Sequence, residues 1–264
     1  MTPDVERVVF FVHVMKTGGS TALRQLLRTY PEDTRYPLPG VFGAIEEKGL
    51  VGSLAKVDPE RRERLRWIAP HVPLSVALDY REHAGRPVAV TLVLRDGFSR
   101  ALSHLRQVSR RFEHQYSYRE LLDLPFLGDF FLSNHQTRVL GSGAETWPLW
   151  DDCVRSLAEL PRGFDEPGST PAVSPVDDAV LERAIANLGA VDVLGLQDEF
   201  GAWWQACREA FDWPEAPTHS VNVGSAQETA PPPPIPDAIL DELRERNALD
   251  TRLYAAARAH LGAG

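Results

Sequence analysis

The sequence predicts an α/β domain of three layers, with a central, mainly parallel β-sheet flanked by helices on both faces. Three observations support this fold class. Apolar runs, typical of strands buried on both faces, occur at residues 8–12 and 88–94, and a further strand is expected at residues 191–196. Apolar residues at helical spacing separate these runs. Strands and helices therefore alternate along the chain, which is the pattern of parallel strands joined by helical crossovers.

Length and composition limit the alternatives. A chain of 264 residues can bury one large core, and we expect a single domain over residues 1–264. Its 43% hydrophobic and 25% charged residues are typical of a globular protein. The net charge of −9 argues against a protein that coats nucleic acid or an anionic membrane. An anionic ligand would have to be bound by individually placed cations.

The cysteines and the N-terminus indicate the compartment. Cys153 and Cys207 have neither metal-type spacing nor a disulfide framework, and we expect two buried thiols in a reducing environment. The N-terminus carries Asp4 and Glu6 and lacks the basic and apolar parts of a secretory signal. No segment is long and apolar enough to span a bilayer. We therefore expect a cytoplasmic protein, and the composition suggests a bacterial source.

The first predicted strand, residues 8–12, leads into a Lys-Thr-Gly-Gly turn at residues 16–19 and then into a helix. Two glycines allow successive N–H groups to point into one hollow, and the helix N-terminus adds partial positive charge. Lys16 supplies a full charge, and Ser20 and Thr21 supply hydroxyl groups. The turn is therefore a candidate site for phosphate or sulfate.

Two alternatives compete for this turn. The nucleotide-triphosphate loop needs a glycine five residues before a Gly-Lys pair, whereas Lys16 precedes the glycines and residues 10–15 contain no glycine. This order disfavours a kinase. The turn can also be a plain connection with a solvated lysine, because most strand-to-helix turns bind nothing.

The next candidate follows a short predicted strand. Residues 31–57 are expected to be irregular with a short helix around Ile45, and residues 58–66 to be helical. A strand at residues 67–69 then ends at a proline that is followed by His71. A lone histidine is more often structural, but open α/β sheets place their chemistry at the carboxyl ends of strands. His71 is therefore a candidate catalytic residue.

The clearest strand, residues 88–94, stops at Arg95 and is followed by a helix that begins near Phe98. A cation at a strand end and a hydroxyl two turns into the helix, Ser103, can converge on a second anion. Alternatively, Arg95 pairs with a carboxylate and Ser103 has no role.

The rest of the chain continues the α/β pattern. We expect a mobile loop at residues 161–176 and a Pro-rich connection at residues 223–236. Aromatic residues at helical spacing between Phe200 and Phe211 indicate core packing. The remaining expected elements are helices at residues 121–140, ending in a polar run at 134–138, a helix at 177–188, a strand at 191–196 and two closing helices between 239 and 261.

Several segments together resemble the sulfotransferases that use 3′-phosphoadenosine 5′-phosphosulfate (PAPS), especially their carbohydrate O-sulfotransferase-like branch. Residues 13–21 (HVMKTGGST) resemble the 5′-phosphosulfate loop, residues 94–104 (LRDGFSRALSH) the 3′-phosphate segment, and residues 68–73 (IAPHVP) the segment with the histidine base. The resemblance covers nearly the entire chain through further segments at residues 134–138, 193–200, 219–223 and 249–254.

The sequence also departs from the family pattern at three positions. Gly97 replaces a family proline that suits the first helical turn, so we expect a slightly looser helix start. Met15 stands where several members have proline. Pro70 precedes His71, where many members have glycine.

The resemblance implies a P-loop-like fold and an enzyme that transfers the sulfonyl group of PAPS to a hydroxyl of a carbohydrate or a natural product, releasing 3′,5′-adenosine bisphosphate. It implies no metal. The catalytic residues would be His71, as general base, and Lys16, which neutralises the leaving oxygen. The donor would be bound by Lys16, Thr17, Gly18, Gly19, Ser20, Thr21, Arg95 and Ser103. An ATP-dependent kinase and a non-catalytic nucleotide-binding protein are the alternatives.

Overall fold

A parallel β-sheet forms the centre of the molecule. The computed structural model describes residues 7–27, 29–36, 58–159, 172–215 and 233–263. Within them, a five-stranded sheet has the strand order β2-β3-β1-β4-β5, and every pairing is parallel. The strands are β1 (Val8–Phe11), β2 (Arg35–Tyr36), β3 (Trp67–Ile68), β4 (Val88–Leu94) and β5 (Val193–Leu196). The predicted fold class is confirmed.

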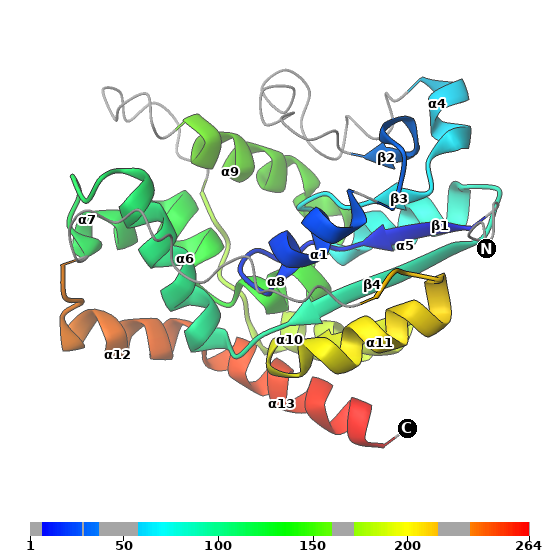
Figure 1. The fold of residues 1–264 in the computed structure, drawn as a ribbon. Coiled ribbons are helices and arrows are strands. Elements are labelled where there is room, and N and C mark those ends of the chain that lie inside the picture. The colour runs from blue at the N-terminus through cyan, green and yellow to red at the C-terminus, as the bar shows by residue number, and fades with distance from the viewer. Residues whose placement is uncertain (1–6, 28, 37–57, 160–171, 216–232, 264) are drawn as a thin grey trace.

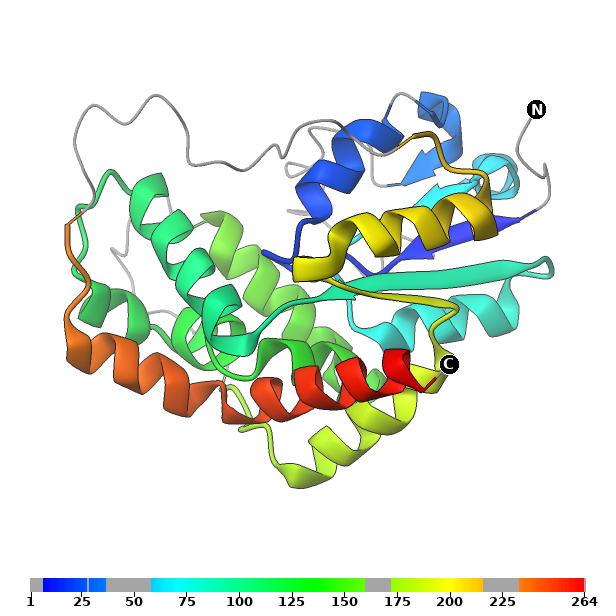
Figure 2. The same cartoon turned by 60° about the horizontal axis from the view of Figure 1, so that its bottom comes forward.

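Helices cover both faces of this sheet (Figures 1 and 2). They are α1 (Gly19–Leu26), α4 (Pro59–Arg64), α5 (Leu74–His83), α6 (Gly97–Arg111), α7 (Tyr118–Leu122), α8 (His135–Gly141), α9 (Trp147–Glu159), α10 (Asp178–Ala186), α11 (Phe200–Phe211), α12 (Asp237–Arg246) and α13 (Ala248–Gly262). A π-helical turn spans Phe126–Phe131. None of the helices that the structure describes has both the length and the apolar character needed to cross a bilayer.

The alternation of side chains along the strands produces two separate cores. In β1, Val9 and Phe11 face a core that contains residues of α1 and α11, including Trp203 and Trp204. Their neighbours in β1 face a larger core built with α5, α6, α8 and the C-terminal helices. Because both faces are buried, the strands need no polar side, and this explains their continuous apolar runs.

The register places three turns at one edge of the sheet. Strand β1 lies between β3 and β4, with Phe10 paired to Ile68 on one side and to Val90 on the other. Since all strands run in the same direction, the turns that follow β3, β1 and β4 emerge together at the carboxyl edge. Helices α6, α7 and α12 extend beyond this edge (Figure 1).

Some predicted elements differ from the observed ones. The predicted helix at residues 121–140 is wrong: the segment is divided into α7, the π-helical turn and α8. Pro125 and Asn134, which has a φ of 45°, stand at the breaks. Helices α5 and α9 were not predicted. The short helix expected near Ile45 lies outside the described residues, as do most of the 161–176 loop and of the 223–236 connection.

The two cysteines are buried free thiols, as predicted. Burial raises the pKa of both thiols to about 12, so that they are protonated at neutral pH. Cys207 packs on the α11 side of the sheet and Cys153 on the opposite side. Both therefore behave as small apolar core residues.

Gly97, the departure from the family pattern at the start of α6, has a packing reason. A Cβ at this position would lie 2.6 Å from the Cβ of Asp250 and 3.1 Å from the carbonyl oxygen of Asn247. The start of α6 is nevertheless capped, because the Asp96 carboxylate accepts a hydrogen bond of 2.8 Å from the Ser99 N–H. The missing side chain allows α13 to pack directly against the first turn of α6.

We expect Gly97→Ala to lower the free energy of unfolding by about 1–3 kcal/mol, because the added methyl group overpacks this contact. Urea denaturation measures the change. Gly201→Ala is the matched control: Gly201 also lies in the first turn of a helix, and a Cβ there has no atom within 4 Å. This control should gain about 0.5–1 kcal/mol. Equal effects of both substitutions would contradict the packing explanation.

Candidate active site

The fold brings three of the predicted site residues to the same edge of the sheet. Lys16 follows β1, His71 follows β3 and Arg95 follows β4, and these strands are neighbours. Each residue lies in the turn between its strand and the next helix. Lys16 and His71 are about 55 residues apart in the chain, and His71 and Arg95 about 25. The parallel order of the strands brings these three residues to one edge.

The turn after β1 has the backbone shape of an anion-binding nest. Lys16 has a φ of 71° and Gly18 a φ of 101°, both in the left-handed region, and α1 begins at Gly19 without a side-chain cap. The alternation of backbone conformations points successive N–H groups to one side. Thr17 is buried and its hydroxyl donates to the Val14 carbonyl at 3.0 Å, so that only its N–H is available to a ligand.

Ser20 and Thr21 lie in the first turn of α1. The Thr21 N–H donates to the Gly18 carbonyl at 2.9 Å and closes the turn. Ser20 is half-buried, with no hydrogen-bond partner among the described residues. Of these two hydroxyl groups, that of Ser20 is therefore better placed to bind an anion at the helix N-terminus.

Because Gly19 has no side chain, the ring of His13 can pack against this turn, and His13 in turn contacts His71. A Cβ at Gly19 would lie 2.1 Å from Nε2 of His13, so the His13 ring occupies the space beside the turn. The same ring is stacked on Phe11 and lies 4.1 Å from the ring of His71, between centroids. His13 therefore packs between the turn at residues 16–19, the candidate anion turn, and His71.

Positive charge gathers at the turn. Arg95 Nη1 donates to the Lys16 carbonyl at 3.1 Å, and Arg95 Nε is buried with no partner among the described residues. Lys16 forms no ion pair with the residues that the structure describes. Burial, followed by the nearby charges of Arg110 and Arg95, lowers the pKa of Lys16. An anion bound here would relieve this repulsion and accept from the unpaired donors.

The surroundings of the His71 ring favour its neutral form and fix its tautomer. Its Nδ1 lies 2.6 Å from the carbonyl oxygen of His13. Because a carbonyl can only accept, Nδ1 carries the proton and Nε2 has a free lone pair. Burial lowers the pKa of His71, although the hydrogen bond to His13 opposes this effect. The His71 carbonyl accepts from Trp150 Nε1 at 2.8 Å, which fixes the turn in place.

The other titratable groups near this edge are less suited to act as the base. His135 is buried against Phe131 and Trp150, and its Nδ1 lies 3.2 Å from the Phe130 carbonyl. Burial lowers its pKa well below the usual value. Glu199 is exposed and forms an ion pair with Arg258. His71 combines partial exposure with a defined tautomer.

Ser103, the second predicted ligand of the 3′-phosphate, forms no hydrogen bond with Arg95. It lies on α6, half-buried, with no hydrogen-bond partner among the described residues. Ser103 comes six positions after Gly97, which corresponds to about 9 Å along the helix axis. Ser103 and Arg110 are seven residues apart and share one face of α6. This face therefore presents a free hydroxyl and a cation.

Sequence reasoning missed two residues that hold Arg95. Gln136 is buried and bonds both the N–H and the carbonyl of Arg95, and Asp250 binds the main chain of Gln136. The polar run at residues 134–138 was visible in the sequence. The sequence did not show that Gln136 is buried or which residues it bonds, because these contacts join residues more than 40 positions apart.

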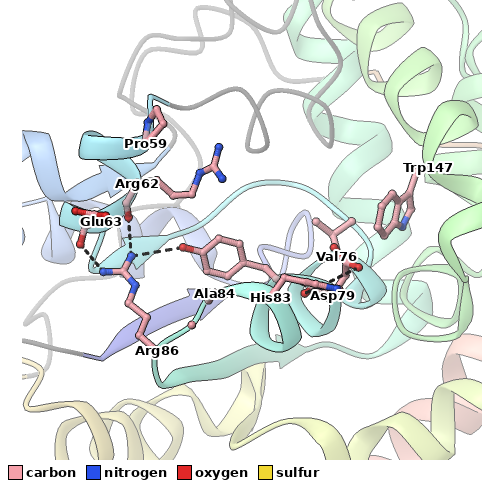
Figure 3. A pocket seen from close by; sticks show the side chains of 11 residues that line it. Pro59, Arg62, Glu63, Val76, Asp79, His83, Ala84, Arg86 and Trp147 are labelled. Atoms are coloured by element: carbon pink, nitrogen blue, oxygen red, sulfur yellow. Dashed lines mark hydrogen bonds and ion pairs between the residues drawn. The ribbon is translucent and has the colours of Figure 1, made fainter.

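A separate hollow of about 610 Å³ lies between α4, α5 and the start of α9 (Figure 3). Arg86 crosses it and donates to the carbonyls of Arg62 and Glu63 at the end of α4, and to the Tyr80 hydroxyl. None of the predicted site residues lines this hollow. The arginine stabilises the C-terminus of α4, and we assign no ligand to the space.

No group of three or more His, Cys, Asp or Glu side chains in the described part of the chain is arranged to hold a metal ion. No protein-family model matches the chain, and no curated protein sequence matches it. Among solved structures, a sulfotransferase from Alicyclobacillus acidocaldarius matches with 16% sequence identity and a TM-score of 0.46, over 95% of each chain.

Proposed function

We propose that this protein is a sulfotransferase that moves the sulfonyl group of PAPS to a hydroxyl of a carbohydrate or natural-product acceptor. One observation carries the proposal. A neutral histidine with a free Nε2 and an anion turn with two cations, Lys16 and Arg95, emerge from three adjacent strands at one edge of the sheet. In-line transfer needs a proton acceptor on one side of the sulfur and positive charge on the other.

His71 acts on the acceptor. Its Nε2 takes the proton of the acceptor hydroxyl as the oxygen forms a bond to sulfur. The bond between Nδ1 and the His13 carbonyl stabilises the imidazolium that results. The lowered pKa of His71 keeps the ring neutral before the reaction. The base is therefore ready at neutral pH without a further proton transfer.

Lys16 acts on the leaving group. As the bond between sulfur and the bridging oxygen breaks, negative charge develops on the departing 5′-phosphate. The ammonium group of Lys16 and the N–H groups of Thr17, Gly18 and Gly19, with the Ser20 and Thr21 hydroxyl groups, neutralise that charge. Because these donors are already fixed by the turn and by α1, little reorganisation is needed during the reaction.

Arg95 and Ser103 would bind the 3′-phosphate of the donor. Arg95 is anchored beside the anion turn through the Lys16 carbonyl and has an unpaired Nε. The Ser103 hydroxyl is free on the adjacent helix. A 3′-phosphate bound by these groups would distinguish PAPS from ATP, which has no phosphate at that position.

Calorimetric titration with 3′,5′-adenosine bisphosphate, 5′-AMP and ATP–Mg²⁺ tests the proposal. We expect a clear preference for the bisphosphate, and Arg95→Ala should lower its affinity by about tenfold or more, since charged hydrogen bonds contribute about 1.5–3 kcal/mol. Arg64→Ala, an exposed arginine on α4, is the control and should change nothing. A preference for ATP would indicate a kinase, and no binding of any nucleotide would overturn the proposal.

A further inference from the structure

The side chain of Gln136 holds the main chain of Arg95 at two points. Its Oε1 accepts from the Arg95 N–H at 2.8 Å, and its Nε2 donates to the Arg95 carbonyl at 2.6 Å. Strand β4 ends at Leu94, so these two polar groups lie just beyond the last strand residue. The amide of Gln136 therefore acts as a one-residue extension of the sheet, and it leaves the Arg95 side chain free for other contacts.

Gln136 is in turn fixed by a buried carboxylate on the C-terminal helix. Asp250 Oδ2 accepts from the Gln136 N–H at 3.1 Å, and Oδ1 accepts from the N–H and the hydroxyl of Thr137 at 2.7 and 2.8 Å. Asp250 also lies 3.8 Å from Arg100 Nε in an ion pair whose two side chains are fully buried. The carboxylate thus caps α8 from another part of the chain.

The cap is reciprocal. Asn134, immediately before α8, uses its Oδ1 to accept from the N–H groups of Leu249 and Asp250 in the first turn of α13. Asn247, immediately before α13, accepts from the Asn134 N–H through its own side chain. Each helix therefore satisfies the free N–H groups of the other, and neither can shift alone.

At its other end, Arg95 contacts the anion turn through the bond from Nη1 to the Lys16 carbonyl. A continuous set of hydrogen bonds therefore runs from Asp250 through Gln136 and Arg95 to Lys16. We infer that Gln136 is a positioning residue for the 3′-phosphate: it places Arg95 so that the protein discriminates nucleotides with this phosphate from those without it. The inference rests on the proposed function.

The discrimination ratio tests the inference. It is the dissociation constant of 5′-AMP divided by that of 3′,5′-adenosine bisphosphate, both measured by calorimetry. Gln136→Leu should lower the ratio about tenfold, by weakening bisphosphate binding while 5′-AMP binding stays within about twofold. Thr137→Val is the matched control, because Thr137 is equally buried on the same helix and bonds Asp250 but not Arg95. It should lower the melting temperature and leave the ratio unchanged.

The outcomes separate this inference from the proposed function. If the unmodified protein shows no preference for the bisphosphate, the proposed function fails. If the preference exists and Arg95→Ala removes it, but Gln136→Leu keeps it, the positioning role is overturned and the function stands. An equal fall of the ratio in Thr137→Val would also overturn it, by showing a general packing effect.

A conservative variant covers the case in which Gln136→Leu does not fold. Gln136→Glu keeps the side-chain shape and an acceptor for the Arg95 N–H, but it places an oxygen opposite the Arg95 carbonyl and the Asp250 carboxylate. Its ratio should fall as well, by less than in the leucine variant because one of the two bonds remains. An unchanged ratio in this folded variant would overturn the inference.

Discussion

Replacing Lys16 by alanine is expected to lower turnover about a hundredfold or more, corresponding to about 3 kcal/mol of transition-state stabilisation. In the proposed mechanism, the ammonium group acts on charge that develops only as the bond between sulfur and the bridging oxygen breaks. Alanine retains a Cβ, so the backbone strain of the positive φ at this position stays the same. Single-turnover release of the bisphosphate under saturating donor and acceptor measures the chemical step.

The interpretation depends on separating turnover from binding. Bisphosphate affinity of Lys16→Ala, measured by the same titration, should fall less than turnover, since backbone N–H groups and Arg95 still bind the ligand. Arg64→Ala, which removes an exposed cation at the end of α4, serves as the charge-matched control. Lost affinity with turnover intact at saturation would contradict the role of Lys16 in the transition state.

His71→Ala should abolish transfer and leave bisphosphate affinity unchanged, because in the proposed mechanism the ring accepts the proton of the acceptor and does not bind the donor. The pH dependence of kcat/KM provides a second measurement. Burial lowers the pKa of His71, so the active neutral form persists below pH 6.5, and activity should fall only in the acid range beneath that value. The His71→Ala protein should lack this acid limb in any residual activity.

The stability of the folded state should also decrease at acid pH. A histidine with a lowered pKa binds fewer protons in the folded than in the unfolded chain, so the free energy of unfolding falls as the pH drops below the unfolded value of about 6.5. His13, His104 and His135 share this lowering by burial. Activity should therefore be measured at a pH where circular dichroism shows the folded state.

Full activity of the His71→Ala variant would contradict the assignment of His71 as the base. It would redirect the search for the base to His13, His135 or Glu199.

The parts of the fold that were predicted correctly are those specified by local pattern. Strand β4 has the predicted bounds, because a run of seven residues that are apolar except for Thr91 and are all buried has no competing arrangement. Helices α6 and α11 were recognised from their apolar spacing. Helix α5 was missed because its buried residues, Leu74, Val76 and Ala77, gather in its first turn and give little helical periodicity.

The prediction of one helix over residues 121–140 was wrong for a related reason. Its apolar residues suggested continuity, but Pro125 limits the preceding turn and Asn134 adopts a left-handed conformation to cap α13. The cap is a contact over 115 residues, so sequence periodicity has no information about it. Tertiary structure thus determined where this segment breaks.

At the candidate site, too, some features are visible in the local sequence and others depend on long-range contacts. Lys16, His71 and Arg95 were identified because strand ends and a glycine-rich turn are visible locally. That His71 carries its proton on Nδ1 depends on the His13 carbonyl, 58 residues away, and the anchoring of Arg95 depends on Gln136, 41 residues away. The sequence predicted the chemical groups at the site, whereas their orientation comes from long-range contacts.

The reciprocal cap between α8 and α13 also bears on the order in which the protein can mature during synthesis. At about 5–20 residues per second, residues 247–250 are made roughly 10–50 s after Lys16. Until they emerge, the first N–H groups of α8 lack their carboxylate cap, and Arg100 lacks its buried partner. A nascent chain can therefore pair β1, β3 and β4 early. The hydrogen bonds from the first N–H groups of α8 to Asp250 form only when α13 docks.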